Sequence, residues 1–343
     1  MFSRSYDIIS VGDCAIDTFL FLDDEDIQIQ NIQGKALATI SWGDKLPVQK
    51  FFKSVAGNAA NNAIASARLG LKTAFYSVIG DDSGGREILH RMKQEGVDTK
   101  YLELSKKYGT NYHTALSNRG ERTIFVYHGM RSYTLPEFSK SSWVYLTSIG
   151  KGFESIYPAL LRFLKKHNVK LGFNPGTYQL RAGSKKNASV LERTDFLCIN
   201  REEAVFWVGQ GSYRELCERL VKLGPKAVTV TDGRRGAFSF SKEGFMYIPE
   251  YPGLKRIEAT GAGDAFTSAY IAALARGKTH AEALTWGPVN AGSVVGKVGP
   301  IDGLLGIKEI QSWLKKKPTY KPIHIRSTKD SDRVLKIIKK ARQ

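Results

Sequence analysis

The chain has 343 residues, of which 42% are hydrophobic and 24% charged. This is the composition of an ordinary globular protein, and it excludes a disordered or fibrous one. The formal net charge is +18, and residues 315–343 carry +9 of it, with eleven Lys and Arg against two Asp. Such a charge is typical of a nucleic-acid-binding protein, but also of a basic tail on a separately functioning body.

Membrane, secreted and metal-centred classes are disfavoured. No apolar run reaches the roughly 18 residues of a membrane-spanning helix, and the first residues lack the pattern of a signal peptide. The three cysteines, Cys14, Cys198 and Cys217, show no CxxC spacing. We therefore expect reduced thiols in a cytoplasmic protein rather than a disulfide framework or a zinc site.

Buried strands alternate with helices along most of the chain, which predicts a mostly parallel sheet covered on both faces. The predicted strands are Tyr6–Gly12, Thr73–Ile79, Trp143–Thr147, Val169–Phe173, Asp195–Ile199, Ala227–Thr231, Ala237–Ser241 and Phe245–Ile248. The predicted helices are 58–69, 85–95, 155–167, 201–208, 212–223, 263–276 and 279–296. In such folds ligands bind at the carboxyl ends of the strands.

Three segments depart from this alternation. Residues 18–53 hold short β-prone runs, and 108–128 read as a hairpin around Asn118-Arg119-Gly120, which together predict a small separate sheet. In the basic tail, Val334, Leu335, Ile337 and Ile338 have helical spacing. We expect a short amphipathic helix there that docks on its own chain.

The loop Gly261-Ala262-Gly263-Asp264 opens an alanine-rich helix. Small residues let the backbone approach an anion, and exposed N–H groups at a helix start favour negative charge. An aspartate beside such a site would repel phosphate, but it suits a base that takes a proton from an attacking hydroxyl. The alternative is a glycine-rich turn capped by Asp264.

The chain resembles the ribokinase/PfkB family of carbohydrate and nucleoside kinases. The run Gly261–Phe266 is similar to the second signature of the family, and Ala56–Ala63 followed by Gly70 and Gly80 is similar to the first. Residues 80–85, 200–203 and 231–236 match further family turns in the family's order. The resemblance spans residues 7 to about 305 and implies a three-layer α/β sandwich with a mostly parallel central sheet and a small β-sheet lid.

The resemblance also implies an activity, the transfer of the γ-phosphoryl group of ATP to a hydroxyl of a small sugar or sugar-like metabolite. Asp264 would be the catalytic base, and Gly261, Ala262 and Gly263 would form the anion hole. A nucleoside acceptor remains an alternative within the same fold.

The expected cofactors are ATP and Mg²⁺. By position in the family, the ATP-binding residues would be Asn200, Thr231, Gly233, Gly236 and Asn290. Asn200 and Glu203 would organise Mg²⁺ largely through water, as this hard ion prefers. An N-cap and its first-turn glutamate, or a plain hairpin turn, explain some of the same residues.

For the acceptor, the resemblance points to Asp17, Gly57, Asn58 and Asn61, with Asp13 as an alternative to Asp17. A carboxylate accepts hydrogen bonds from two adjacent hydroxyls, which suits a polyol. Asn61 also lies in a predicted helix, where asparagine is a poor helix former.

Further expectations concern organisation. Residues 1–318 would form the kinase domain, with 18–53 and 108–128 as lid segments that exclude water, and 319–343 would be the basic tail. A homodimer through the lid is a hypothesis that follows from the family. Glu258-Ala259 stands where many members carry Asp-Thr beside a monovalent cation, so dependence on K⁺ is left open. Arg122 in the hairpin is either an acceptor-binding residue or solvated surface.

Two other nucleotide-binding classes fail on spacing. A Rossmann enzyme needs GxGxxG after the first strand, where this chain has Gly12-Asp13-Cys14. A P-loop needs GxxxxGK[ST], and the run from Gly292 to Val298 has neither that spacing nor the hydroxyl. The nucleic-acid-binding alternative rests on charge alone.

Overall fold

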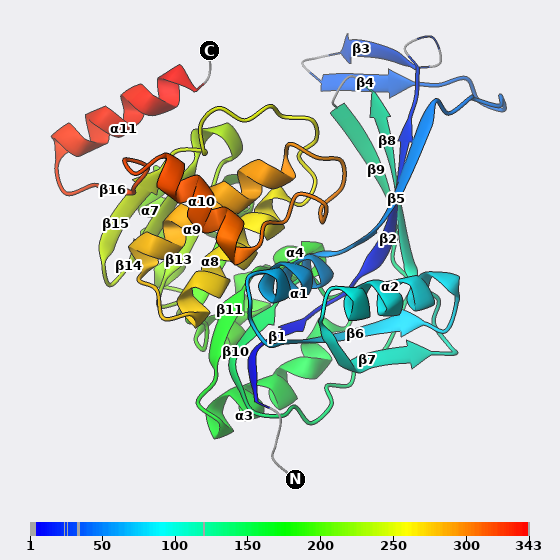
Figure 1. Ribbon diagram of the computed structural model, residues 1–343, viewed down its shortest axis with the longest axis horizontal. Helices are drawn as coiled ribbons and strands as arrows, with labels where there is room; N and C mark the ends of the chain where they lie inside the picture. The colour runs from blue at the N-terminus through cyan, green and yellow to red at the C-terminus, as the bar shows by residue number, and fades with distance from the viewer. Residues whose placement is uncertain (1–4, 24, 26, 33–34, 119–120, 342–343) are drawn as a thin grey trace.

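The computed structural model describes residues 5–23, 25, 27–32, 35–118 and 121–341. Figure 1 shows a large sheet covered by helices, with a smaller sheet projecting from it. The large sheet has ten strands in the order β16-β15-β14-β13-β12-β11-β10-β1-β6-β7. Its strands are β1 (Tyr6–Val11), β6 (Thr73–Gly80), β7 (Asp98–Ser105), β10 (Ser141–Leu146), β11 (Lys170–Phe173), β12 (Phe196–Asn200), β13 (Val228–Thr231), β14 (Ala237–Ser241), β15 (Gly244–Ile248) and β16 (Ile323–His324).

Seven neighbouring strands of this sheet are parallel, namely β7, β6, β1, β10, β11, β12 and β13, and β14, β15 and β16 add an antiparallel edge. Every residue of β6 is buried, as expected for a parallel strand covered on both faces. One helical layer contains α1 (Asn58–Arg68), α2 (Ser83–Gln94), α8 (Ala262–Ala275), α9 (His280–Val294) and α10 (Ile307–Lys316). The other contains α3 (Tyr157–Lys166), α4 (Thr177–Lys186), α5 (Ala188–Leu191), α6 (Arg201–Val208), α7 (Tyr213–Val221) and α11 (Thr328–Lys340). The predicted three-layer sandwich is confirmed.

The smaller sheet has four strands in the order β5-β2-β8-β9, and we call it the lid sheet. Its strands are β2 (Ala15–Phe21), β5 (Lys50–Ala56), β8 (Asn111–Asn118) and β9 (Glu121–Tyr127). A ribbon of β3 (Gln28–Ile32) and β4 (Lys35–Thr39) extends beyond it (Figure 1). The expected hairpin is confirmed by the pairing of β8 with β9, while Arg119 and Gly120 of its turn lie outside the described residues. Because β2 follows β1 after three residues, the lid sheet starts at the carboxyl edge of the large sheet.

The basic tail is part of the core rather than a free appendage. Its strand β16 pairs with β15, and its helix α11 buries Val334 and Ile338 against the large sheet. The expected docking on its own chain is therefore confirmed. Leu335, expected on the same face, is 53% exposed, because a helix of 3.6 residues per turn places positions 334 and 338 together and turns 335 away.

The elements that were not predicted include strands β7 and β16 and helices α4, α5 and α10. Strand β7 was missed because an edge strand with polar, partly exposed positions lacks the apolar run used to find the others. Helix α4 buries only Gln179 and so has no apolar stripe. Among the described residues, no helix is long and apolar enough to cross a membrane.

Candidate active site

The candidate residues gather at the carboxyl edge of the large sheet. Asp13 follows β1, Asn200 ends β12 and Thr231 ends β13, and Asn174, which was not predicted from the sequence, follows β11. Parallel strands bring these ends to one edge, where a ligand site is expected in open α/β sheets. The lid sheet and the first turn of α8 meet the same edge.

The anion loop, residues 261–263, forms the start of α8. Gly261 is the N-cap residue with φ of 78°, and a Cβ there would lie 2.5 Å from that of Pro300. Only glycine accommodates both the left-handed backbone and this close approach. The loop therefore presents the first amides of α8, which lack intrahelical partners and can meet an anion.

Asp264 lies in the first turn of α8. Its Oδ2 accepts a hydrogen bond of 2.8 Å from Nδ2 of Asn61, which lies on α1. Burial raises the pKa of Asp264 to about 6; the Asn61 bond opposes this rise, while the negative charges of Glu203 and Asp17 add to it. A carboxylate whose pKa lies near neutrality suits a general base.

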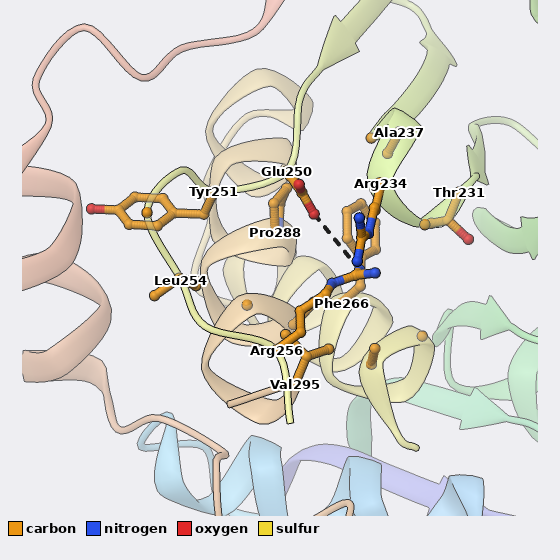
Figure 2. Close-up of a pocket in the computed structure, with 17 residues that line it drawn as sticks. Thr231, Arg234, Ala237, Glu250, Tyr251, Leu254, Arg256, Phe266, Pro288 and Val295 are labelled. Atoms are coloured by element: carbon orange, nitrogen blue, oxygen red, sulfur yellow. Dashed lines mark ion pairs between the residues drawn. The ribbon is translucent and has the colours of Figure 1, made fainter. Parts of the chain in front are cut away.

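A cavity of about 450 Å³ lies beside the anion loop. Figure 2 shows its wall, which joins apolar side chains such as Phe266, Pro288 and Val295 to charged ones. Glu250 and Arg256 form an ion pair of 3.6 Å in this wall, and Arg234 points toward that pair. A pocket of this size that combines apolar side chains with a few charged groups is typical of a small-molecule site.

Most of the residues expected at ATP reach this cavity. Of the five, Thr231, Gly233 and Gly236 line it, whereas Asn200 and Asn290 do not. Of the three residues expected at the anion hole, Ala262 and Gly263 line it and Gly261 does not. Asn290 is fully buried. Its Nδ2 donates to the carbonyl oxygen of Ala265, and its Oδ1 accepts from the backbone amide of Leu305, each at 2.9 Å. This geometry gives Asn290 a structural place, and its neighbours Pro288, Ala291 and Gly292 form the cavity wall.

Asn200 and Glu203 form a capping box at the start of α6. Oδ1 of Asn200 accepts from the backbone amide of Glu203 at 2.9 Å, and the backbone amide of Asn200 donates to Oε2 of Glu203 at 3.0 Å. Burial raises the pKa of Glu203. Among the described residues no three His, Cys, Asp or Glu side chains are close enough to hold a metal directly. The donors fit an ion held mainly through water, because Glu203, Asp264 and Asp17 concentrate negative charge at this edge.

The residues expected at the acceptor lie together between α1 and the lid sheet. Asp13, Asp17 and Asn61 are all buried, and Oδ1 of Asp13 and Oδ1 of Asn61 have no hydrogen-bond partner within the described part of the chain. Gly57 has φ of 106°, and a Cβ there would lie 2.7 Å from Cα of Cys14, so this glycine allows α1 to begin against the loop after β1. Nδ2 of Asn58 lies 3.5 Å from Oδ1 of Asn174. Buried polar atoms without partners are expected where a ligand supplies them.

Three aromatic residues at this site were missed from the sequence. Nδ1 of His113 lies 2.9 Å from Oδ1 of Asp17, and the ring of His128 lies 5.2 Å from that of His113. Tyr133 donates to Oδ2 of Asp13 at 2.8 Å, and burial raises the pKa of Asp13 to about 6. Burial also lowers the pKa of His128 to about 4. The only available signal was the position of His113 in the predicted hairpin, since the pairing of Asp17 with His113 joins strands far apart in sequence.

Comparisons with known proteins agree with this geometry. The model of the pfkB family of carbohydrate kinases matches residues 28–305. The chain is 30% identical over 292 residues to a 5-dehydro-2-deoxygluconokinase of Halalkalibacterium halodurans, which covers 78% of this chain and 88% of the relative.

Solved structures share the fold. The structure of Arabidopsis thaliana ribokinase complexed with ribose and ATP has a TM-score of 0.76 at 21% identity and covers 91% of this chain and 99% of its own. A putative ribokinase II from E. coli, in complex with ATP and Mg²⁺, has a TM-score of 0.71 at 18% identity and covers 90% and 99%. The family and the kinase relative favour a sugar acceptor over a nucleoside or a nucleic acid. The chain belongs to the pfkB family of carbohydrate kinases and is an ATP-dependent sugar kinase.

Proposed function

We propose that Asp264 is the base of this kinase and that the γ-phosphoryl group passes from the cavity beside α8 to a sugar hydroxyl on the α1 side. One observation carries this proposal. Asp264 follows Ala262 and Gly263, which line the cavity, and it is bonded to Asn61, which lies among the acceptor candidates. The base thus lies between the two groups of residues, with a pKa of about 6.

The acceptor would be held by Asp17 and Asn61, with Asp13 and His113 beside them. The unpartnered oxygens of Asp13 and Asn61 require donors, and sugar hydroxyls supply these, while the carboxylate of Asp17 can accept from further hydroxyls besides His113. The proton of the attacking hydroxyl would go to a carboxylate oxygen of Asp264. The amides of residues 261–263 would stabilise the charge on the transferred group.

The nucleotide would occupy the 450 Å³ cavity, with its phosphates toward Gly263 and Arg234. Mg²⁺ would be held by Asn200 and Glu203 through water and would neutralise phosphate charge when bound. The capping box of these two residues keeps their oxygens at the end of β12.

Two acceptors have priority. The kinase relative at 30% identity is named for 5-dehydro-2-deoxygluconate, and the Arabidopsis neighbour is complexed with ribose. We propose that the substrate is a small sugar or sugar acid of this kind.

The decisive experiment measures ADP release from ATP and Mg²⁺ with pools of pentoses, hexoses, sugar acids and nucleosides. We expect turnover with a sugar pool and a loss of roughly a thousandfold or more in Asp264→Asn. Asp302→Asn, an exposed change, is the matched control. Undiminished turnover in Asp264→Asn would falsify the assignment of the base. Turnover with nucleosides alone would overturn the sugar acceptor.

We further propose a homodimer through the lid sheet. Strand β9 exposes Ile124, Phe125, Val126 and Tyr127 at the edge of that sheet, and an apolar edge strand is expected to be covered. A mass in solution of 38.1 kDa would overturn the dimer. Exposure of Phe125 predicts that Phe125→Glu separates the subunits.

Residues 1–318 are proposed as the kinase unit, and 319–343 as a tail that stabilises it through Val334 and Ile338. Because Val334 and Ile338 pack in the core, removal of 319–343 should lower the stability of the remaining chain, as measured by thermal unfolding.

We also propose a cytoplasmic location, because the three cysteines are buried and form no disulfide.

A further inference from the structure

An ion pair joins the lid sheet to the loop before α8. Arg122 lies on β9, and its Nη1 is 3.1 Å from Oε1 of Glu258. The side chain of Glu258 is 7% exposed and that of Arg122 is 26% exposed, so water screens this pair only weakly. The structure thus contradicts the interpretation of Arg122 as solvated surface, and in this structure it contacts a carboxylate of the protein.

Glu258 also fixes the backbone next to the anion loop. Its Oε1 accepts from the amide of Thr260 at 2.7 Å and from the hydroxyl of the same residue. The amides of Ile257 and Glu258 both donate to the carbonyl oxygen of Val295, at 2.7 and 3.1 Å. The carboxylate of Glu258 therefore holds Thr260, the residue immediately before Gly261. The carbonyl oxygen of Val295 holds the two residues at 257 and 258.

The remaining atoms of the pair have no other support. Oε2 of Glu258 and Nε of Arg122 are buried and have no hydrogen-bond partner within the described part of the chain. Within the same part, Arg122 forms the one ion pair of Glu258. A buried carboxylate that loses its counter-ion is strongly disfavoured, so the conformation of residues 258–261 depends on the position of β9.

We propose that Arg122 is a positioning residue that makes formation of the anion hole depend on closure of the lid sheet. With the lid closed, the guanidinium neutralises Glu258, the amide of Thr260 is fixed, and the amides of residues 261–263 are aligned. With the lid displaced, Glu258 is uncompensated and the loop loses this anchor. Transfer would then be suppressed until the acceptor is enclosed, which limits loss of the phosphoryl group to water. The catalytic part of this inference rests on the proposed function, whereas the ordering of the loop does not.

A second ion pair between the lid sheet and the body provides a matched control. Lys53 on β5 pairs with Glu87 on α2, and both side chains are more than a third exposed. Lys53→Ala weakens lid contact without touching the loop at 258–261. Arg122→Ala removes both lid contact and the counter-ion.

The first test is hydrogen exchange of the peptide covering 255–266 in the full chain, which needs no known acceptor. In Arg122→Ala we expect the amide of Thr260 to exchange at least about tenfold faster than in the parent protein, because a charge-assisted anchor is weakened. Glu258→Gln should show the same increase and Lys53→Ala a much smaller one, because its exposed ion pair contributes little to lid closure. The double variant Arg122→Ala with Glu258→Gln should be no faster than either single one, because the two residues act as one unit.

The second test is kinetic and chemical. In Arg122→Ala we expect kcat to fall roughly 10- to 100-fold with KM for ATP nearly unchanged, because alignment rather than binding is lost. Millimolar guanidinium chloride should restore part of kcat and of the exchange protection in Arg122→Ala, but not in Glu258→Gln, and NaCl at equal ionic strength should not. Arg122→Lys should retain more protection than Arg122→Ala.

The outcomes separate the two proposals. Unchanged exchange in Arg122→Ala, or equal acceleration in Lys53→Ala, overturns the role of Arg122 whatever the acceptor is. If exchange is altered in Arg122→Ala but neither the parent protein nor any variant shows turnover, the role of Arg122 as a loop anchor is supported and the proposed function is not. If Arg122→Ala fails to fold, Glu258→Gln and Arg122→Lys give the same comparison.

Discussion

Nδ2 of Asn61 donates to Oδ2 of Asp264 across 2.8 Å, although 203 residues separate the two along the chain. A second bond of 3.1 Å, from Nδ2 of Asn62 to the hydroxyl of Ser268, joins the same two helices. Asn61 thus belongs at once to the acceptor group and to the environment of the base. Its bond lowers the pKa of Asp264 against the larger effect of burial, so it helps to keep the base ionised near neutrality.

Removal of this bond should change the pH dependence of catalysis. In Asn61→Ala the pKa of Asp264 rises above about 6, so less of the base is ionised at neutral pH. We expect the acid limb of kcat/KM to move to higher pH by roughly one unit. Asn62→Ala is the control, since it removes the neighbouring bond to Ser268 but no contact with the base. An acid limb that stays in place in Asn61→Ala would show that another group titrates.

Asp264 should also reduce stability at neutral pH. Its pKa is raised from 3.8 to about 6 in the folded state. The folded state therefore favours the protonated carboxyl. The stabilisation from this protonated form is fully present below pH 3.8 and is lost as pH rises through about 6, which leaves a buried ionised carboxylate at neutral pH. Asp264→Asn should increase the free energy of unfolding by about 1–3 kcal/mol at about pH 7.5, and by less as pH falls toward about 4. Urea unfolding at both pH values measures this, with the exposed change Asp44→Asn as control. A gain that does not depend on pH would show that burial of the ionised carboxylate is not its cause.

The two glycines of the anion loop should respond differently to alanine. Gly261 has φ of 78°, and a Cβ would lie 2.5 Å from Cβ of Pro300, whereas a Cβ at Gly263 meets nothing within 4 Å. We expect Gly261→Ala to lose about 1–3 kcal/mol of stability and most of the activity, because the loop must shift. Gly263→Ala should fold normally but raise KM for ATP, since Gly263 lines the cavity. Equal melting temperatures for the two variants would argue against the strain at Gly261.

The order of strands and helices and the anion loop could be predicted from local sequence, because buried strands and a glycine-rich helix start have local signals. The three-layer fold, the hairpin of β8 and β9 and the docking of the tail followed from such signals. Strand β7 and helix α4 did not, because neither has an apolar pattern of its own.

Contacts between distant segments could not be predicted in the same way. The pairing of His113 with Asp17 depends on a parallel register between β2 and β8, and the pairing of Arg122 with Glu258 depends on where the lid sheet meets the body. Neither register nor docking has a local signal in one sequence. Asn290 is a position that the sequence placed at the ATP site but the structure does not. Its buried side chain bonds Ala265 and Leu305 and does not line the cavity.

Arg234 should contribute to binding of the nucleotide phosphates. It lines the cavity and is exposed, and it forms no ion pair within the described part of the chain, whereas the adjacent Arg235 is 2.9 Å from Oδ2 of Asp232 and does not line the cavity. We expect Arg234→Ala to raise KM for ATP by about 3- to 10-fold with kcat nearly unchanged, because a charge that contacts ground state and transition state equally is lost. Arg235→Ala should leave KM for ATP within about twofold, since an exposed ion pair contributes little. If kcat rather than KM falls in Arg234→Ala, this arginine acts on the transferred group and not on the bound nucleotide.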